Sequence, residues 1–352
     1  MVVDVTGFGW SGSGAVHDLL REYKDVDFRY DGEFTILWSV DGIYDLEEKL
    51  CHKHCRFADS NMAIKRFLSL IKAYETEPLL PYHRFFRGNF ENICSKYIED
   101  LIQVTFKGHT LYEITLKTKK DFFVDYYNNL EKKLLGNRIS KKVFGGDFYR
   151  KFQIANKSNL YLSYNPQNFE ERTKELMGEL FSYLRTDRDL PLITNQMFPP
   201  DCPSLFFKYI GEPTKSIIVR RDPRDVYLLA KKTYQSSIPL PIDNVEDFII
   251  FYKKTIEETR LDDSDIILNL NFEDLIYKYE ETKLKIENFI GVSLHERPKA
   301  YFNPSISVNN TQLFKKYKGY EREIQRIEEE LRDSLYPFEC CKVITSITDN
   351  VF

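Results

Sequence analysis

The chain has 352 residues, enough for one large domain or two smaller ones, and 42% of them are hydrophobic, so a sizeable core is expected. The formal net charge of −4 excludes the global positive field that is typical of nucleic-acid-binding proteins. No run of about 18 apolar residues predicts a membrane span, and the N-terminus lacks the basic flank and apolar segment of a signal peptide. Six cysteines without a targeting segment predict reduced thiols and a cytoplasmic protein.

The first 32 residues predict a strand, a glycine-rich turn and a helix, followed by a second short strand. Residues 1–7 are apolar and β-branched, and residues 14–23 have helical spacing of Val16, Leu19, Leu20 and Tyr23. Residues 26–30 predict the second strand, which an Asp-Gly turn follows.

The rest of the chain alternates between helical and strand patterns. A long middle segment, roughly 44–188, has helical patterns rich in Tyr, Phe and Lys. Strands are predicted over 189–198, 216–221 and 265–271, and helices over 246–260, 274–290 and 320–335. Continuous apolar strands that alternate with helices predict an α/β fold with a parallel sheet flanked by helices. We expect one domain over 1–352, in which residues 45–188 form a largely helical insertion or a substrate-side subregion.

A cluster of possible metal ligands occurs at residues 51–55, with the sequence CHKHC. In a helix Cys51 and Cys55 would share one face, while the two histidines would project elsewhere. No second ligand pair occurs nearby to complete a tetrahedral site. The sequence therefore favours a helix end with buried cysteines over a metal site.

The glycine-rich turn partly matches two nucleotide-binding motifs. Gly7, Gly9 and Gly12 fit G-x-G-x-x-G, the dinucleotide fingerprint, but the acidic residue expected about 20 positions later is poorly placed. Residues 9–14 also have the Walker A spacing, with Ala15 and Val16 in place of Lys and Ser/Thr. Without these two side chains, magnesium-assisted hydrolysis of ATP or GTP is not expected. What remains is an anion cradle of backbone N–H groups from residues 11–15 at a helix N-terminus, aided by the hydroxyls of Ser11 and Ser13.

Three segments, in this order, resemble the sulfotransferases that use 3′-phosphoadenosine 5′-phosphosulfate (PAPS), nearer to their glycan-modifying and bacterial branch. Residues 11–14 (SGSG) resemble the 5′-phosphosulfate loop, residues 219–227 (VRRDPRDVY) the 3′-phosphate motif, and residues 271–291 a later family segment. The resemblance covers roughly residues 1–40 and 190–335, and it implies a P-loop-type fold, PAPS as co-substrate and no required metal. The cofactor-binding residues that it implies are Trp10, Ser11, Gly12, Ser13, Gly14, Ala15 and Arg221, with Lys231 as a possible substitute cation.

The sequence departs from the family pattern at three positions. Trp10 occupies the position of the loop lysine, and Leu229 that of the 3′-phosphate serine. Residues 302–310 replace the basic loop near the C-terminus, so Lys231, Lys232, Ser236, Lys315 and Lys316 are candidate substitutes. These losses affect the expected catalysis more than the expected binding.

The resemblance also suggests a general base. The family's cytosolic branch uses a histidine, but the matching stretch, residues 194–199, offers amides instead. The sugar-modifying branch uses a glutamate just after the second strand, and Glu33 lies 23 residues after Trp10. We therefore predict Glu33 as the base, with His17 as a lower-ranked catalytic candidate.

The acceptor expected from this base is a carbohydrate or glycan hydroxyl. Aromatic residues of the middle segment are candidates for stacking on sugars, for holding a sterol or lipid alcohol, or for forming core: Phe122, Phe123, Tyr126, Tyr127, Tyr149 and Phe152. Two other functions remain open at this point, a nicotinamide-dependent oxidoreductase and a non-catalytic nucleotide-binding protein.

Overall fold

The computed structural model describes residues 1–29, 32–52, 56–78, 80, 82–108, 110, scattered positions between 123 and 142, 158–234, 240–257, 259 and 264–338. The chain forms two compact units. The first comprises Met1–Ser39, Tyr74–Phe90 and Glu170–Phe352, and the second comprises Val40–Ala73 and Glu91–Phe169.

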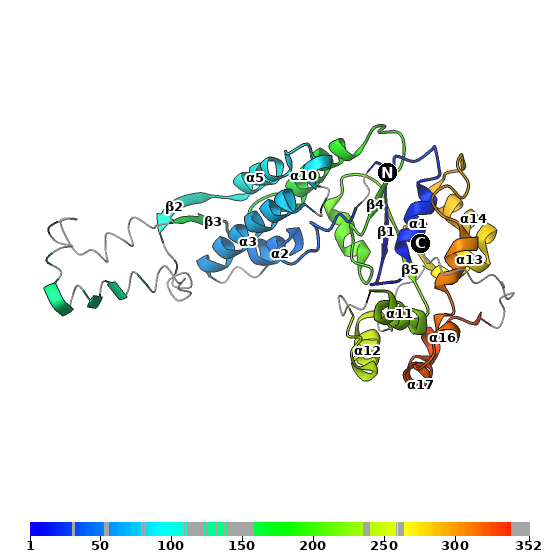
Figure 1. Cartoon of the computed structure of the whole chain (residues 1–352). Coiled ribbons are helices and arrows are strands. Elements are labelled where there is room, and N and C mark those ends of the chain that lie inside the picture. Colours follow the sequence, from blue (N-terminus) through cyan, green and yellow to red (C-terminus); the bar gives the residue numbers. More distant parts are fainter. Residues whose placement is uncertain are drawn as a thin grey trace. The chain divides into compact units, whose positions relative to one another are not determined.

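A four-stranded parallel sheet forms the centre of the first unit (Figure 1). Its strands are β1 (Val2–Gly7), β4 (Leu192–Asn195), β5 (Thr214–Arg220) and β6 (Ile267–Asn271), in the order β4-β1-β5-β6. In this register Val5 lies opposite Asn195 on one side and Ile217 on the other. The carboxyl ends of all four strands therefore meet at one edge of the sheet, and the expected parallel α/β fold is confirmed.

Both faces of the sheet are covered, since every residue of β1 is buried. On one face, Val3 and Val5 belong to a hydrophobic cluster with the helices α1 (Ser13–Leu20), α13 (Phe272–Tyr277) and α14 (Tyr279–Ile290). On the other face, the carboxylate of Asp4 is buried and accepts hydrogen bonds from the backbone of residues 197 and 198. A second cluster joins α11 (Pro223–Leu229) to α12 (Val245–Tyr252) and α17 (Glu321–Glu330).

The remaining helices are short or continue these elements. In the first unit they are α4 (Tyr82–Phe85), η2 (Pro203–Tyr209), η3 (Ala230–Tyr234), η4 (Lys253–Glu257), α15 (Pro304–Ser307), η5 (Val308–Asn310), α16 (Leu313–Lys316) and η6 (Arg332–Ser334). The helix α10 (Phe169–Leu184) precedes β4 in the chain. Among the described residues, no helix has both the length and the apolar character that a bilayer crossing requires.

Within residues 26–29, the described part of the predicted second strand, pairing is limited to a single bridge at Asp27. Its backbone N–H donates to the Pro191 carbonyl at 2.8 Å, and its carbonyl accepts from the Ile193 N–H at 3.1 Å. The Asp27 carboxylate accepts from the backbone N–H groups of Thr186 (2.5 Å) and Asp187 (2.9 Å). This local network ends the pairing, so the predicted strand over 26–30 was wrong in extent. The other four predicted strands are confirmed.

The second unit is not purely helical. Its helical elements are α2 (Ile43–Glu47), η1 (Glu48–His52), most of α3 (Phe57–Thr76) and α5 (Phe90–Leu101). An antiparallel pair, β2 (Val104–Gly108) and β3 (Ser158–Leu162), also forms, which the helical patterns of the sequence did not predict. The predicted insertion over 45–188 differs from this unit, since residues 74–90 and 170–188 belong to the first unit. The residues outside the described ranges include His54, Cys55, Phe122, Tyr149 and Phe152.

Candidate functional site

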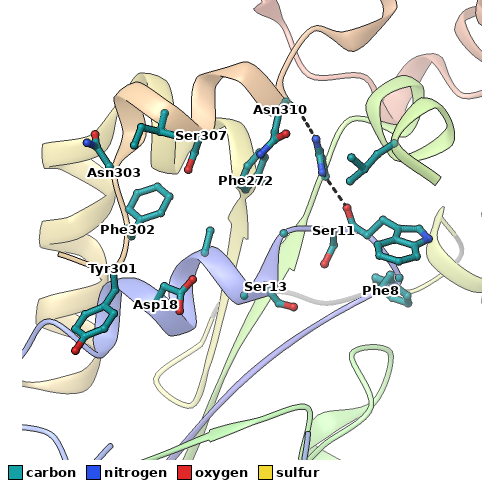
Figure 2. A pocket seen from close by; sticks show the side chains of 18 of the residues that line it. Phe8, Ser11, Ser13, Asp18, Phe272, Tyr301, Phe302, Asn303, Ser307 and Asn310 are labelled. Atoms are coloured by element: carbon teal, nitrogen blue, oxygen red, sulfur yellow. Dashed lines mark hydrogen bonds between the residues drawn. The ribbon is translucent and has the colours of Figure 1, made fainter. Parts of the chain in front are cut away.

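A pocket of about 940 Å³ lies at the carboxyl ends of the strands in the first unit (Figure 2). Residues that directly follow β1, β4, β5 and β6 all reach its wall: Phe8, Gln196, Arg221 and Phe272. In open parallel sheets this edge is where ligands bind, at the point where neighbouring crossovers leave on opposite faces. The topology therefore creates the pocket.

The glycine-rich loop has a conformation that requires glycine at two positions. Gly12, which precedes α1, has a φ of 88°, and a methyl group there would lie 2.5 Å from the Phe272 ring. A methyl group on Gly7 would lie 2.8 Å from the carbonyl oxygen of Val219. The loop thus packs directly on β5 and on the start of α13.

Two of the five backbone N–H groups expected to point inward are used within the loop. The N–H of Ser11 donates to the Phe8 carbonyl at 2.9 Å, and that of Ala15 donates to the Gly12 carbonyl at 3.0 Å. Among the described residues, none accepts from the N–H groups of Gly12, Ser13 and Gly14. These three donors lie at the positive end of the α1 dipole and line the pocket.

The hydroxyl of Ser11 adds a further donor. Ser11 is only 2% exposed, and its Oγ has no hydrogen-bond partner within the described part of the chain. A buried hydroxyl without a partner costs free energy, about 1–3 kcal/mol in mutational data. Since Ser11 also lines the pocket, a bound ligand with a hydrogen-bond acceptor would provide the Ser11 hydroxyl with a partner.

The structure brings Arg221 to this loop. Its guanidinium donates to the Trp10 carbonyl at 3.3 Å and to the Asn310 carbonyl, and it lies 4.7 Å from the centre of the Phe272 ring. The side chain of Arg221 is 5% exposed, so its positive charge is largely withdrawn from solvent while it lines the pocket. It links the loop to the end of η5.

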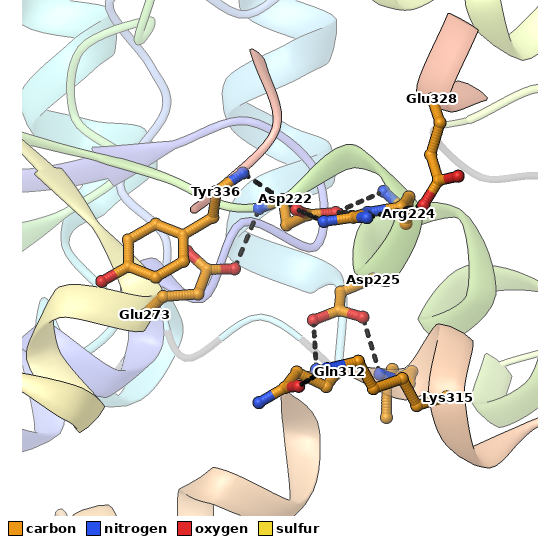
Figure 3. A network of polar contacts seen from close by, with 9 residues as sticks. Asp222, Arg224, Asp225, Glu273, Gln312, Lys315, Glu328 and Tyr336 are labelled. Carbon is orange, nitrogen blue, oxygen red and sulfur yellow. Dashed lines mark hydrogen bonds and ion pairs between the residues drawn. The ribbon is translucent and has the colours of Figure 1, made fainter. Parts of the chain in front are cut away.

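A polar network surrounds Asp222, Arg224 and Asp225 at the start of α11 (Figure 3). Asp222 caps α11 and forms a two-pronged ion pair with Arg224, at 2.9 and 2.7 Å, and Arg224 also pairs with Glu328 at 2.7 Å. Asp225 accepts from the backbone N–H groups of Gln312 and Leu313, both at 2.7 Å. This network holds the residues that follow η5 against the start of α11.

Three buried carboxyl groups, one within β1 and two near the end of β5, have raised pKa values. Burial raises the pKa of Glu273 to about 8, and the negative charges of Asp225 and Asp222 add to the effect. Burial, with repulsion from Asp222, raises the pKa of Asp225 to about 7. Burial also raises the pKa of Asp4 to about 6, although backbone N–H donors oppose this. The positive charge of Arg221 opposes the rise in pKa of Glu273 and of Asp225.

Glu33 lines the same pocket as the loop. Its side chain is exposed, and the backbone around it is held by the Phe34 N–H, which donates to the Asn195 carbonyl at 2.9 Å. The Tyr82 hydroxyl also donates to the Glu33 carbonyl, at 3.4 Å. The sequence-based placement of Glu33 at the strand-end edge therefore agrees with its position.

Two other candidates lie elsewhere. His17 is 3% exposed, packs with its ring 4.3 Å from that of Phe28, and is not among the residues that line the pocket. Lys231 donates to the Tyr227 hydroxyl at 2.9 Å and to the Ile242 carbonyl at 3.0 Å, and it too is absent from the pocket wall. His17 lies one turn after the loop and faces the core. Lys231 belongs to η3, where the chain has already left the edge of the sheet.

One wall of the pocket comes from residues 299–310, of which residues 302–310 were expected only to replace the family's basic loop. Figure 2 shows Tyr301, Phe302, Asn303, Ser307 and Asn310 along this segment, which faces α1. It is anchored by the buried carboxylate of Glu22, which accepts from the N–H groups of residues 299, 301 and 302 at 2.8–3.1 Å. No sequence motif signals this contact between residues about 280 positions apart.

Trp10 and Leu229, the two positions at which the resemblance leads one to expect a lysine and a serine, both line the pocket. Both carry apolar side chains and pack with the hydrophobic cluster of α11 and α12. Within the described pocket wall, the cationic side chains are those of Arg221 and Lys299.

No protein-family model and no curated protein sequence matches this chain. Among solved structures, the sulfotransferase domain of the olefin synthase of Synechococcus PCC 7002 aligns with 12% sequence identity and a TM-score of 0.38, covering 86% of this chain and 76% of that domain. The sulfotransferase domain of the curacin biosynthetic pathway aligns with 12% identity and a TM-score of 0.37, covering 94% of this chain and 97% of that domain.

Proposed function

We propose that this protein transfers a sulfuryl group from PAPS to a hydroxyl acceptor, releasing adenosine 3′,5′-bisphosphate. The observation that supports this most directly is the anion-binding set at the loop. The unpaired hydroxyl of Ser11 and the N–H groups of Gly12, Ser13 and Gly14 line one pocket with the Arg221 charge. An elongated ligand with anionic groups would satisfy all of these donors.

The chemistry of the loop favours a sulfated nucleotide over a nucleoside triphosphate. Ala15 and Val16 provide neither the lysine charge nor the metal-binding hydroxyl of a Walker A motif. A phosphosulfate requires neither, because its leaving group is stabilised by hydrogen-bond donors aimed at the oxygens where charge develops. The positive charge of Arg221 would lie toward the nucleotide's 3′-phosphate.

In the proposed reaction Glu33 acts as the general base. The acceptor oxygen attacks sulfur as the bond between sulfur and the bridging phosphate oxygen breaks, and the hydroxyl proton passes to the Glu33 carboxylate. Glu33 is suited to this role because it is exposed and lines the same pocket as the loop. A base on the solvent side of the pocket is compatible with a large, polar acceptor, so we propose a carbohydrate or glycan hydroxyl.

The proposal is tested by ligand binding and then by turnover. Adenosine 3′,5′-bisphosphate is expected to raise the melting temperature more than NAD or ATP at equal concentration, because a ligand that binds the native state stabilises it. Labelled PAPS is then incubated with a panel of glycans, sterols and lipid alcohols, and sulfated products are separated. No stabilisation by the bisphosphate would refute the proposal.

Two other outcomes identify other functions. Stabilisation by the bisphosphate without a sulfated product from any acceptor would indicate a non-catalytic binding protein, which the apolar Trp10 and Leu229 favour. Stabilisation by NAD alone would indicate an oxidoreductase. The latter is disfavoured because Asp27, the acid nearest the expected position, bonds to Thr186 and Asp187 and is not part of the pocket wall.

A further inference from the structure

Gln196 has an unusual backbone conformation at the centre of the site. It follows β4 directly and has a φ of 56°, the left-handed region that non-glycine residues rarely adopt. Its N–H donates to the Val5 carbonyl at 3.0 Å, so the strand pairing continues into this residue. Such a conformation is strained for a residue with a side chain and persists only where other contacts hold it.

The side chain of Gln196 bridges the two ends of the glycine-rich loop. Its Oε1 accepts from the Thr6 hydroxyl at 2.8 Å, while its Nε2 donates to the Gly7 carbonyl at 3.1 Å and to Ser13 Oγ at 3.3 Å. Gly7 ends β1 and Ser13 begins α1, so one carboxamide joins the entrance and the exit of the loop. Glutamine provides the donor and the acceptor together, which neither glutamate nor methionine does.

The main chain at the same place holds the segment that carries Glu33. The Gln196 carbonyl accepts from the Trp38 indole N–H at 2.9 Å, and the carbonyl of the preceding Asn195 accepts from the Phe34 N–H at 2.9 Å. These two bonds flank residues 34–38. The carbonyl oxygens of residues 195 and 196 point toward these two donors only while Gln196 keeps its left-handed conformation.

We propose that Gln196 is a positioning residue that fixes the glycine-rich loop and the Glu33 segment relative to each other. Its side chain acts on the loop, and its backbone acts on residues 33–38. The catalytic consequence of this role rests on the proposed function, whereas the positional role itself does not.

Three variants separate these two actions. Gln196→Met removes the side-chain bonds and leaves the backbone strained, while Gln196→Gly removes the same bonds but permits the left-handed conformation without strain. Gln312→Met is the matched control. Gln312 also has a left-handed backbone (φ 52°) and side-chain bonds, to Tyr277 and Lys315, but it is absent from the pocket wall.

The first measurement is amide hydrogen exchange in the unliganded protein, which reports local opening. In Gln196→Met, the protection of the Ser11, Ala15 and Phe34 amides is expected to fall about 10-fold, as for the loss of about 1.4 kcal/mol. In Gln196→Gly, Ser11 and Ala15 lose protection while Phe34 stays closer to the wild type. Unchanged protection in Gln196→Met, or equal losses in Gln312→Met, would overturn the proposal.

The second measurement uses adenosine 3′,5′-bisphosphate and PAPS. Gln196→Met is expected to bind the bisphosphate about 10-fold more weakly, and to lose more in kcat than in affinity, because the base segment moves as well. Gln312→Met is expected to match the wild type in both. If the wild-type protein binds no bisphosphate, the proposed function fails, while the exchange measurement still decides the role of Gln196.

Discussion

The Glu273 carboxyl group makes the stability of this protein depend on pH. Burial raises its pKa from an ordinary value of 4.5 to about 8. Between these values the native protein holds a proton on Glu273 that the unfolded chain has released, so the free energy of unfolding falls as the pH rises. The loss is complete above about pH 8, and at about 1.4 kcal/mol per tenfold change in proton affinity it reaches at most about 5 kcal/mol.

The Glu273→Gln variant removes this titration and keeps the essential contact. The carboxamide oxygen still accepts the hydrogen bond that the Asp222 N–H makes to Glu273 Oε1 at 2.9 Å. We therefore expect urea unfolding to show that the wild type loses about 2–5 kcal/mol more than the variant between about pH 5 and about pH 9.

Glu321→Gln serves as the control for removing one carboxylate. Glu321 is exposed, and hydrogen bonds from backbone N–H groups lower its pKa, so it titrates below this window. Its stability profile should run parallel to that of the wild type. Parallel profiles for the wild type and Glu273→Gln would refute the reasoning, because they would show that Glu273 is ionised in the native protein across the whole range.

Three further predictions concern the pocket. Glu33→Gln should leave the bisphosphate affinity unchanged and lower turnover of PAPS about 10²–10⁴-fold; unchanged turnover in a kinetic assay would remove Glu33 from the role of base. Gly12→Ala should lower the free energy of unfolding, measured in urea, by about 1–3 kcal/mol, because Gly12 has a φ of 88° and its new methyl group would contact Phe272. Gly14→Ala is the control, since a methyl group there meets no atom within 4 Å. Equal effects of the two substitutions would contradict the loop geometry. Arg221→Lys should weaken bisphosphate binding about 10-fold or more in calorimetry, since lysine cannot span the Trp10 carbonyl and a phosphate together; wild-type affinity would exclude a role for the guanidinium in binding.

The sheet could be predicted because its strands are short, continuous apolar runs with glycine or charge at their ends. Residues 1–7 and 216–221 have this pattern, and both strands form where expected. The sequence over 26–30 (VDFRY) instead alternates apolar with charged residues. In its described part, residues 26–29, pairing is limited to one bridge at Asp27, whose carboxylate bonds to residues 186 and 187, distant in sequence. The β2–β3 pair was missed because the whole middle segment was interpreted as helical, although residues 104–107 (VTFK) alternate apolar and polar side chains.

The site could be predicted where it follows from strand ends. The loop and Arg221 lie at one edge because parallel strands end together, as expected. Glu33 lines the same pocket, although the strand expected before it is limited to a bridge at Asp27. His17 was a candidate because it lies only one helical turn after the glycine-rich loop in the sequence. Successive helical residues are rotated by about 100°, and the rotation at His17 directs its side chain into the core. The wall at residues 299–310 depends on the buried Glu22, a tertiary contact that local patterns do not encode.

The two tryptophans of the chain are both part of the neighbourhood described above. Trp10 belongs to the pocket wall, and the indole N–H of Trp38 is bonded to the carbonyl of Gln196. Tryptophan emission, excited selectively over the 23 tyrosines, therefore arises entirely from the vicinity of the pocket, with no distant indole to contribute background. Replacing either tryptophan with phenylalanine leaves a single reporter, so that occupancy of the loop and movement of the Glu33 segment can be followed as separate optical signals without any label.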